Sequence, residues 1–231
     1  TISSHAINVS LYSKLPYDAL KDFAPITMLA TQPNMLVVHA TLPAKNVKEF
    51  IALAKSRPNQ LNFGSAGSGT SQHISGEMFK TLTGVQMQHV PYKGSGQMIP
   101  DLLAGYVELS FENIATAHPL TTSGKLRALA VTSAKRSFLA PDVPTMQEAG
   151  VPGFDISSWQ AMFAPANTAP AILSRLNTEV NIILRSAETQ KRFRDLGLET
   201  GGGPAEDLAE VIRKDIPRLG KIVRESGARV D

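Results

Sequence analysis

The chain has 231 residues, a formal net charge of +3 and no cysteine, and 42% of its residues are apolar. This length and composition predict one large domain or two small ones with a buried core. The basic residues are scattered, which excludes the clustered basic surface that nucleic acids need, and the lack of cysteine excludes disulfides, thiolate catalysis and cysteine-based zinc sites. Apolar runs such as Leu126 to Val131 are far shorter than the ~20 residues of a membrane-spanning helix, so we expect no membrane insertion.

The order of the predicted elements is typical of an α/β protein. Short runs with β-branched residues alternate with amphipathic segments, which favours βα units and mostly parallel strands. We expect strands at 35–39, 61–64, 87–90, 107–111, 126–132 and 158–165, and helices near 47–57, 70–83, 96–104, 169–186, 188–196 and 204–226. The segment 139–154 is rich in proline and glycine and is expected to be a connector around one short helical segment.

The loop after the second predicted strand, from Ser65 to Thr70, consists almost entirely of small residues. At a strand-to-helix junction the first backbone N–H groups of the helix have no partner within it, and the helix dipole adds positive charge there. Gly67 and Gly69 allow positive φ and the close approach of a ligand, and the hydroxyl groups of the loop add donors. The loop therefore predicts a site for an anion of carboxylate size, although the two glycines could also do no more than turn a tight βα corner.

Three well-known kinds of small-residue loop do not match this one. A phosphate-binding Walker loop needs a lysine where Thr70 follows Gly69, so ATP and GTP are not expected. The order G-x-x-G-x-G is the reverse of the dinucleotide fingerprint, so NAD is not expected. Neither Ser65 nor Ser68 lies at the centre of a G-x-S-x-G nucleophile elbow. We therefore expect no cofactor.

A second corner of the same kind lies in 89–98, where Ser95 and Gly96 follow a predicted strand and precede a helix. Two such corners in neighbouring βα units would place donors around one anion. Lys93 could add a positive charge, or could be a solvated turn residue. Asn113 begins a further helix, either as its N-cap or as a ligand contact.

The five histidines are expected to be isolated, because no pair has the i, i+4 spacing of a helical zinc site and carboxylates do not cluster near them. We therefore expect no metal site. His73, one turn into a predicted helix, is more typical of a helix-surface or capping residue than of a ligand. An α/β hydrolase that uses Ser68 with His73 or His89 is an alternative, because donor-rich loops also form oxyanion holes. The lack of a nucleophile elbow and of an acid partner counts against it.

Several long segments together resemble one family. They are "LNFGSAGSGTSQHISGEMF", "HVPYKGSGQMIPDLLAGYVELSFEN", "GKLRALAVTSAKRS" and "PDVPTMQEAGVPGFDISSWQAMFAPANTAP", with the opening "TISSHAINVSLYSKLPYDALKDFAPIT". In content and order they are similar to the Bug family, also called TctC-like receptors, over nearly the whole chain. The resemblance implies a periplasmic solute receptor of a tripartite tricarboxylate transport system, with membrane transporter subunits as partners and no catalytic step.

The resemblance also implies a fold and a site. The fold would be a two-lobe, type II-like periplasmic binding protein that closes over a small carboxylate, such as a di- or tricarboxylate, an amino acid or an aromatic acid. Lobe one would comprise 1–31 and 157–231 and lobe two 32–156, with crossings near Ala30 to Gln32 and Gly153 to Ser157. The expected ligand contacts, which come from βα loops, a loop near the start and one helix start, are Ser3, Ser4, Ser65, Ala66, Gly67, Ser68, Gly69, Thr70, Ser95, Gly96 and Asn113.

One departure from the family concerns the start of the chain. Family members begin with a strand and a glycine-rich loop that grips the ligand carboxylate, and this chain starts after both. We expect lobe one to lack its N-terminal strands, to keep one strand near Thr1, and to expose apolar surface on its C-terminal helices. The lack of an initiator methionine and of a leader segment predicts a removed signal peptide or a partial sequence. A ligand-sensing regulatory domain is a further alternative, but no helix-turn-helix segment accompanies it.

Overall fold

The computed structural model describes residues 1–230, which divide into two compact units. Unit 1 comprises Thr1–Gln32, Ser158–Arg224 and the residues from Ala228 onward, and unit 2 comprises Pro33–Ser157 and Glu225–Gly227. The long strand β1 (Phe23–His39) contributes its first part to unit 1 and its second part to unit 2. The two closing lobes expected from the sequence stay a prediction.

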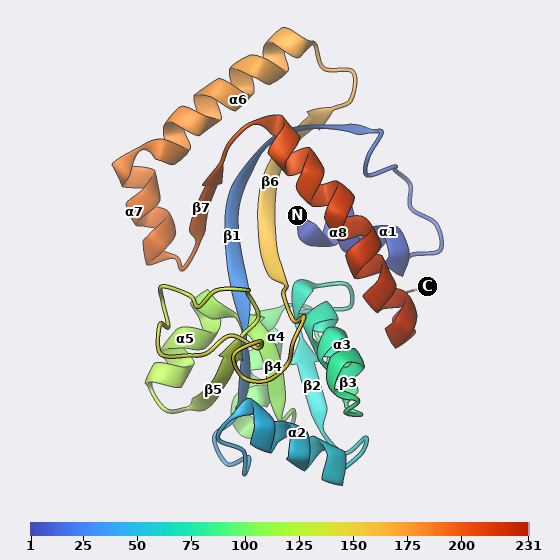
Figure 1. Cartoon of the computed structure of the whole chain (residues 1–231), viewed down its shortest axis with the longest axis vertical. Helices are drawn as coiled ribbons and strands as arrows, with labels where there is room; N and C mark the ends of the chain where they lie inside the picture. The colour runs from blue at the N-terminus through green and yellow to red at the C-terminus, as the bar shows by residue number, and fades with distance from the viewer. Residues whose placement is uncertain (231) are drawn as a thin grey trace. The chain divides into compact units, whose positions relative to one another are not determined.

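Unit 2 is built on a mixed sheet that is covered on both faces. Its other elements are the strands β2 (Asn62–Ser65), β3 (Gln88–Pro91), β4 (Leu109–Asn113) and β5 (Leu126–Val131), and the helices α2 (Val47–Ser56), α3 (Ser71–Thr83), α4 (Ser95–Ala104) and α5 (Ile114–Thr122) (Figure 1). The strand order is β3-β2-β4-β1-β5, with β2 parallel to β3 and β4, and β1 antiparallel to β4 and β5. The expectation of mostly parallel pairing is therefore wrong, because β1 lies between β4 and β5 and runs against both.

Local sequence sets most element boundaries in this unit. Asn46 and Thr70 cap α2 and α3 by accepting hydrogen bonds from backbone N–H groups three residues later. Gly84 ends α3 with a φ of 71°, which favours glycine. Strand β4 begins and ends two residues later than predicted. The connector at 139–154 contains no helix, so the short helical segment expected there is wrong.

Different side chains bury the two faces of this sheet. On the face of α2 and α3, four phenylalanine rings that are 0% exposed pack together: Phe50, Phe79, Phe111 and Phe154. The ring of Phe63, also 0% exposed, packs against His73 and His89. On the other face, β1, β5, α4 and α5 contribute an aliphatic cluster that includes Met35, Val37, Met98, Leu102, Ile114 and Val131. Because both faces are covered, β1 is buried without interruption from Gln32 to Val38, where a half-exposed strand would alternate.

Three strands of unit 2 end at one edge of the sheet, and each is followed by a helix. Since β2, β3 and β4 run in the same direction, their carboxyl ends share this edge, and α3, α4 and α5 begin there. Strand β1 brings Asn34 to the same edge, opposite Asn113. We call this the carboxyl edge, and it gathers the loops that the sequence analysis singled out.

Unit 1 surrounds the first part of β1. Its strands β6 (Ser157–Pro165) and β7 (Glu199–Gly202) both pair with β1, and its helices are the π-helical turn η1 (Ser3–Ile7), α1 (Asn8–Leu11), α6 (Pro170–Arg185), α7 (Ala187–Asp195) and α8 (Ala205–Ser226) (Figure 1). The strand expected near Thr1 is wrong. That segment is helical because Ile2, Ala6, Ile7 and Leu11 recur at helical spacing and are all buried.

The segment 197–204, expected only to separate two helices, contains β7. Gly201 lies so close to the backbone of Met28 on β1 that a side chain would not fit there, which is why glycines occupy this strand. Trp159 on β6 donates from Nε1 to Asp215 on α8 at 2.9 Å, and both are buried. Helix α6, in contrast, leaves Ile182 59% exposed and buries few of its side chains. This helix therefore contributes little to the core of unit 1.

Candidate functional site at the carboxyl edge of unit 2

The glycine-rich loop between β2 and α3 is held by hydrogen bonds of its own. Gly67 and Gly69 have φ values of 139° and 78°, which side chains with a Cβ rarely adopt. Four amides of the loop are already paired: Ala66 with Oε1 of Gln72, Gly67 with Oγ of Ser65 at 3.2 Å, Gly69 with Nδ1 of His73 at 3.1 Å, and Thr70 with the Gly67 carbonyl at 3.3 Å. These four amides maintain the shape of the loop and are not free for a ligand.

The amides without a partner lie at the tip of this loop and at two helix starts. Among the described residues, no acceptor pairs with the backbone N–H groups of Ser68, Ser71, Gln72, Ser95 and Gly96. Ser71 and Gln72 open α3 and are only 6% and 2% exposed. Unpaired N–H groups in buried positions are rare in proteins. These donors therefore mark a place where a ligand or water would accept hydrogen bonds.

Two hydroxyl groups of the loop have internal partners. The Ser65 hydroxyl is buried and lies 3.1 Å from the Gly67 carbonyl oxygen and 2.7 Å from Nε2 of His89. The Thr70 hydroxyl donates to the same carbonyl at 2.7 Å and caps α3. A hydroxyl has a single proton to donate. Neither Ser65 nor Thr70 therefore offers its hydroxyl to a solute, although both were expected to contribute donors.

A buried carboxyl group joins the three helix starts. Oε1 of Glu112, at the end of β4, accepts from Nε2 of Gln72 at 2.7 Å, from the Ser95 hydroxyl at 3.0 Å and from the backbone N–H of Asn113 at 2.8 Å. The Ser95 hydroxyl also accepts from Nε2 of Gln72 at 3.1 Å. The proton of Ser95 is thus committed to Glu112, so this residue can offer a ligand only its backbone amide. Burial raises the pKa of Glu112, against the effect of its three hydrogen bonds.

Two histidines stack beneath the glycine-rich loop. The rings of His73 and His89 lie 3.8 Å apart with an interplanar angle of 12°, and His73 is 4% exposed. Burial lowers the pKa of His73 to about 4 and that of His89 to about 3, so both are neutral at neutral pH. The expectation of isolated histidines, with His73 at a helix surface, is wrong, because their ring faces pack as part of the core. His73 accepts the Gly69 amide through Nδ1, which requires the neutral ring.

The hydrolase dyad proposed from the sequence does not form. Ser68 is exposed, and no hydrogen bond joins it to His73 or His89 among the described residues. The serine of this loop that does contact a histidine is Ser65, which is 0% exposed and supports the loop. A nucleophile must reach the substrate. Neither serine therefore combines access with a neighbouring base.

The predicted site residues fall into two groups. Unit 2 brings together all of them except Ser3 and Ser4, which lie in η1 of unit 1, where the Ser4 hydroxyl donates to the Thr1 carbonyl at 3.2 Å. A ligand contact from these two serines stays a prediction. Asn113 is the N-cap of α5, as one alternative held, but its side chain makes no capping hydrogen bond.

Sequence reasoning missed Gln72 and Glu112, which connect the loops. A signal for Glu112 was available, because it lies in the strand segment "LSFEN", and a glutamate is rarely buried in a strand unless it has partners. Gln72 gave no comparable signal, since glutamine in the first turn of a helix is ordinary.

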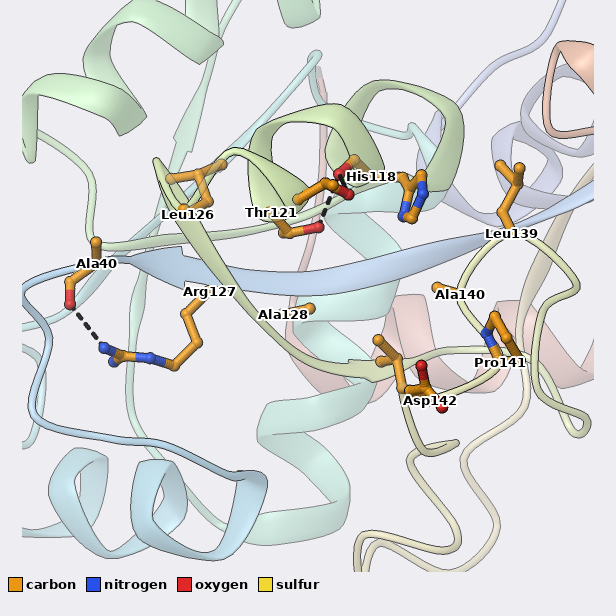
Figure 2. Close-up of a pocket in the computed structure, with 13 residues that line it drawn as sticks. Ala40, His118, Thr121, Leu126, Arg127, Ala128, Leu139, Ala140, Pro141 and Asp142 are labelled. Atoms are coloured by element: carbon orange, nitrogen blue, oxygen red, sulfur yellow. Dashed lines mark hydrogen bonds between the residues drawn. The ribbon is translucent and has the colours of Figure 1, made fainter.

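A separate pocket of about 520 Å³ lies elsewhere on unit 2, lined by residues of β5, α5 and 139–143 (Figure 2). None of the predicted site residues lines it. The guanidinium of Arg127 donates to the carbonyl oxygens of Ala40, Leu42 and Ala44, each at 2.9 Å, and so holds the turn after β1. The donors of Arg127 therefore serve the fold, and this pocket is not the candidate anion site.

The clustering of side chains and the composition of the helices bear on metal and membrane binding. Within residues 1–230, no three His, Asp or Glu side chains gather closely enough to hold a metal ion. Over the same range, no helix has both the length and the apolar character needed to cross a bilayer.

Comparison with known proteins places the chain in a family. Residues 2–228 match the profile of the "Tripartite tricarboxylate transporter family receptor". The protein BugT of Bordetella pertussis is 36% identical over 97% of this chain and 69% of its own length. A protein from the tcbD-tcbE intergenic region of Pseudomonas sp. strain P51 is 34% identical over 93% of this chain and 64% of its own length. The chain thus spans about two thirds of the length of these relatives.

Solved structures agree with this placement. The structure of R. palustris Rpa4515 with adipate has a TM-score of 0.91 and 39% identity, over 99% of this chain and 77% of that protein. MatC from Rhodopseudomonas palustris with bound malate has a TM-score of 0.86 and 31% identity, over 96% of this chain and 76% of that protein. The periplasmic binding protein BugD has a TM-score of 0.87 and 28% identity, over 99% of this chain and 77% of that protein. The resemblance to Bug and TctC-like receptors is confirmed: the chain belongs to the receptor family of tripartite tricarboxylate transporters.

Proposed function

We propose that this chain binds a small carboxylate at the carboxyl edge of unit 2 and is the solute receptor of a tripartite transporter. It would act in the periplasm, deliver its ligand to membrane subunits and leave the ligand chemically unchanged. The observation that carries this proposal is the set of unpaired backbone amides at the starts of α3 and α4. Helix N-termini attract anions because unpaired N–H groups and the helix dipole act together.

The relatives support a carboxylate as the ligand class. The titles of two similar structures name adipate and malate, which are both small dicarboxylates. A carboxylate accepts several hydrogen bonds at once, which suits a group of converging amides better than it suits an apolar pocket. The amides of Ser71, Gln72, Ser95 and Gly96 are the donors that we assign to it.

A receptor role without catalysis is supported by the state of the reactive groups. The hydroxyls of Ser65, Thr70 and Ser95 are committed to internal acceptors, and among the described residues of the carboxyl edge no histidine is hydrogen-bonded to the exposed Ser68. The edge therefore offers donors that bind and lacks a group placed to react.

The test uses the melting temperature of the chain with and without adipate or malate. A ligand that binds only the folded state stabilises it, by about 3 kcal/mol at a concentration one hundred times the Kd. For a chain of this length that corresponds to a rise of roughly 5–10 °C. The uncharged diamide of adipate is the matched control ligand and is expected to produce no rise.

Gly96 offers a variant that separates binding from folding. A Cβ at Gly96 would meet no atom within 4 Å, so a side chain there projects into open space at the start of α4. We expect Gly96→Val to melt within about 2 °C of the parent without ligand and to lose the rise with adipate. A rise of the same size in Gly96→Val would place the site elsewhere.

A further inference from the structure

The carboxyl group of Glu112 is buried at the carboxyl edge, and one of its two oxygens has no hydrogen-bond partner within residues 1–230. Its Oε1 accepts three hydrogen bonds, and the donors come from the second residue of α3, the first residue of α4 and the N-cap of α5. Its Oε2 is buried and has no hydrogen-bond partner among the described residues. A buried carboxyl oxygen without a partner is costly, and the cost is much larger when the group is charged.

Among the residues that the structure describes, no cation pairs with this carboxyl group. Burial, the largest influence on Glu112, raises its pKa. The titratable groups on or beside the surrounding elements are His39 on β1, His73, Glu77 and Lys80 on α3, His89 on β3, Lys93 before α4, Asp101 on α4, Glu108 just before β4 and His118 on α5. Lys80 pairs with Glu77 at 2.8 Å, and Lys93 is exposed in its loop. A negative charge on Glu112 is therefore offset by the starts of α3, α4 and α5 and by the hydrogen bonds that they donate.

A bound carboxylate would compete for the same helix starts. The free amides that we assign to the ligand belong to Gln72 and Ser95, whose side chains already contact Glu112, and to the residues beside them. The ligand would therefore place a second negative charge next to a buried first one. Two carboxylates that share a site with little water do not both stay ionised. The carboxylate whose environment stabilises a negative charge less well takes a proton.

We propose that Glu112 takes up a proton when a carboxylate binds at the carboxyl edge, and so sets how affinity depends on pH and on the charge of the ligand. This inference rests on the proposed function. Protonation leaves Oε1 as the acceptor of the three existing hydrogen bonds and places the proton on Oε2, the oxygen that now lacks a partner. Ser110 has a buried hydroxyl that also lacks a partner, and it lies on the same face of β4 because side chains of a strand alternate. Its oxygen is the acceptor that we assign to this proton, directly or through a buried water.

Isothermal titration calorimetry counts the protons. Adipate is titrated into the chain at several pH values between about pH 5 and pH 8. At each pH the titration is done in two buffers that differ in ionisation enthalpy, and neither buffer contains a carboxylate or phosphate. The difference in apparent enthalpy gives the protons taken up per adipate. We expect an uptake that approaches about one proton within this range, and a Kd that falls as the pH is lowered.

Variants assign the proton to a residue. Glu112→Gln keeps an oxygen acceptor for the three donors and removes the titratable charge, so we expect it to bind adipate without proton uptake and with a Kd that no longer improves at lower pH. Glu108→Gln is the matched control. Glu108 lies just before the first residue of β4, whereas Glu112 lies near the end of that strand, and the Glu108 carboxylate accepts from the Asn62 backbone N–H at 2.8 Å. The Glu108→Gln variant is expected to retain the uptake.

The two proposals fail in different ways. If adipate binds the unmodified chain without proton exchange over the whole pH range, or if Glu112→Gln retains the uptake, the inference about Glu112 is wrong and the proposed function stands. If neither adipate nor malate binds at all, both are overturned. Should Glu112→Gln fail to fold, the proton count on the unmodified chain decides by itself.

Discussion

The Nε2 amide of Gln72 donates to Oε1 of Glu112 at 2.7 Å, and both side chains are almost completely buried. The same Gln72 side chain accepts the backbone N–H of Ala66 through its oxygen. One residue in the first turn of α3 thus fixes the glycine-rich loop on one side and the end of β4 on the other. Preorganised donors bind a ligand better than mobile ones, because ordering costs are met during folding.

Loss of Gln72 should destabilise the chain. Gln72→Met preserves the approximate size of the side chain but removes one of the three hydrogen bonds to Glu112 and leaves the Ala66 N–H without its partner. We expect the free energy of unfolding to fall by about 2–3 kcal/mol, since hydrogen bonds to charged or buried groups are the expensive ones to remove. Urea denaturation measures the change. A loss below about 0.5 kcal/mol, typical of surface positions, would mean that Gln72 does not hold this site together.

Two glycines of unit 2 should respond in opposite ways to the same substitution. A methyl group on Gly76 in α3 would overlap the ring of Phe63, which is 0% exposed, whereas one on Gly96 would meet nothing within 4 Å. We expect Gly76→Ala to cost about 1–3 kcal/mol by overpacking, and Gly96→Ala to be neutral or to stabilise by up to about 1 kcal/mol through helix propensity. Melting temperatures of the two variants, measured side by side, check this contrast, and equal effects would contradict the packing described here.

The serines of the glycine-rich loop should also differ. Ser65 is 0% exposed and its hydroxyl lies within hydrogen-bond distance of Gly67 and His89, so Ser65→Ala is expected to cost about 1–3 kcal/mol. Ser68 is exposed, and Ser68→Ala is expected to change stability by less than about 0.5 kcal/mol. An ester-hydrolysis assay gives a second readout. Turnover that disappears in Ser68→Ala would favour the hydrolase over the receptor.

The stacked histidines predict a loss of stability in acid. Burial lowers the pKa of His73 from 6.5 to about 4 and that of His89 from 6.5 to about 3. As the pH falls below 6.5, the unfolded chain binds protons on these two residues while the folded chain does not, so protonation favours the unfolded state. The free energy of unfolding should therefore decrease from about pH 6.5 down to about pH 4, with up to two protons involved.

Denaturation curves at a series of pH values measure this slope. The double variant His73→Gln with His89→Gln is expected to show a shallower slope, whereas His118→Gln, on α5 and outside the stack, keeps the parent slope. An unchanged slope in the double variant would mean that other groups cause the acid sensitivity. The loop should also loosen as His73 gains a proton, because Nδ1 could no longer accept the Gly69 amide.

The parts of the fold that depend on neighbours in sequence were predictable. The helices predicted at 47–57, 70–83 and 169–186 are confirmed as α2, α3 and α6, and the glycine corner was placed correctly between β2 and α3. The direction of β1 was not predictable, because no local feature records that it enters the sheet between β4 and β5. Strand β7 was missed because its glycines are a response to the backbone of Met28, more than a hundred residues away.

The site was predictable in position and not in its details. Small residues at a strand-to-helix corner indicated free amides, yet which amides are free depends on the partners that Gln72 and His73 supply from the helix. The serine hydroxyls expected as donors are engaged by Glu112 and by the Gly67 carbonyl, and such pairings depend on the register of three strands. Histidine stacking likewise follows from the pairing of β2 with β3, which the sequence pattern does not show.

Backbone amide NMR of the chain during a titration with adipate shows directly which amides bind the ligand. Hydrogen bonding to a carboxylate shifts the resonance of the donating N–H, so the donors can be identified one by one. We predict that the largest changes occur at Ser71, Gln72, Ser95 and Gly96, the unpaired amides of the carboxyl edge. Saturation with adipate that leaves these four resonances in place, with the changes confined to other residues such as those around Arg127, would contradict the account.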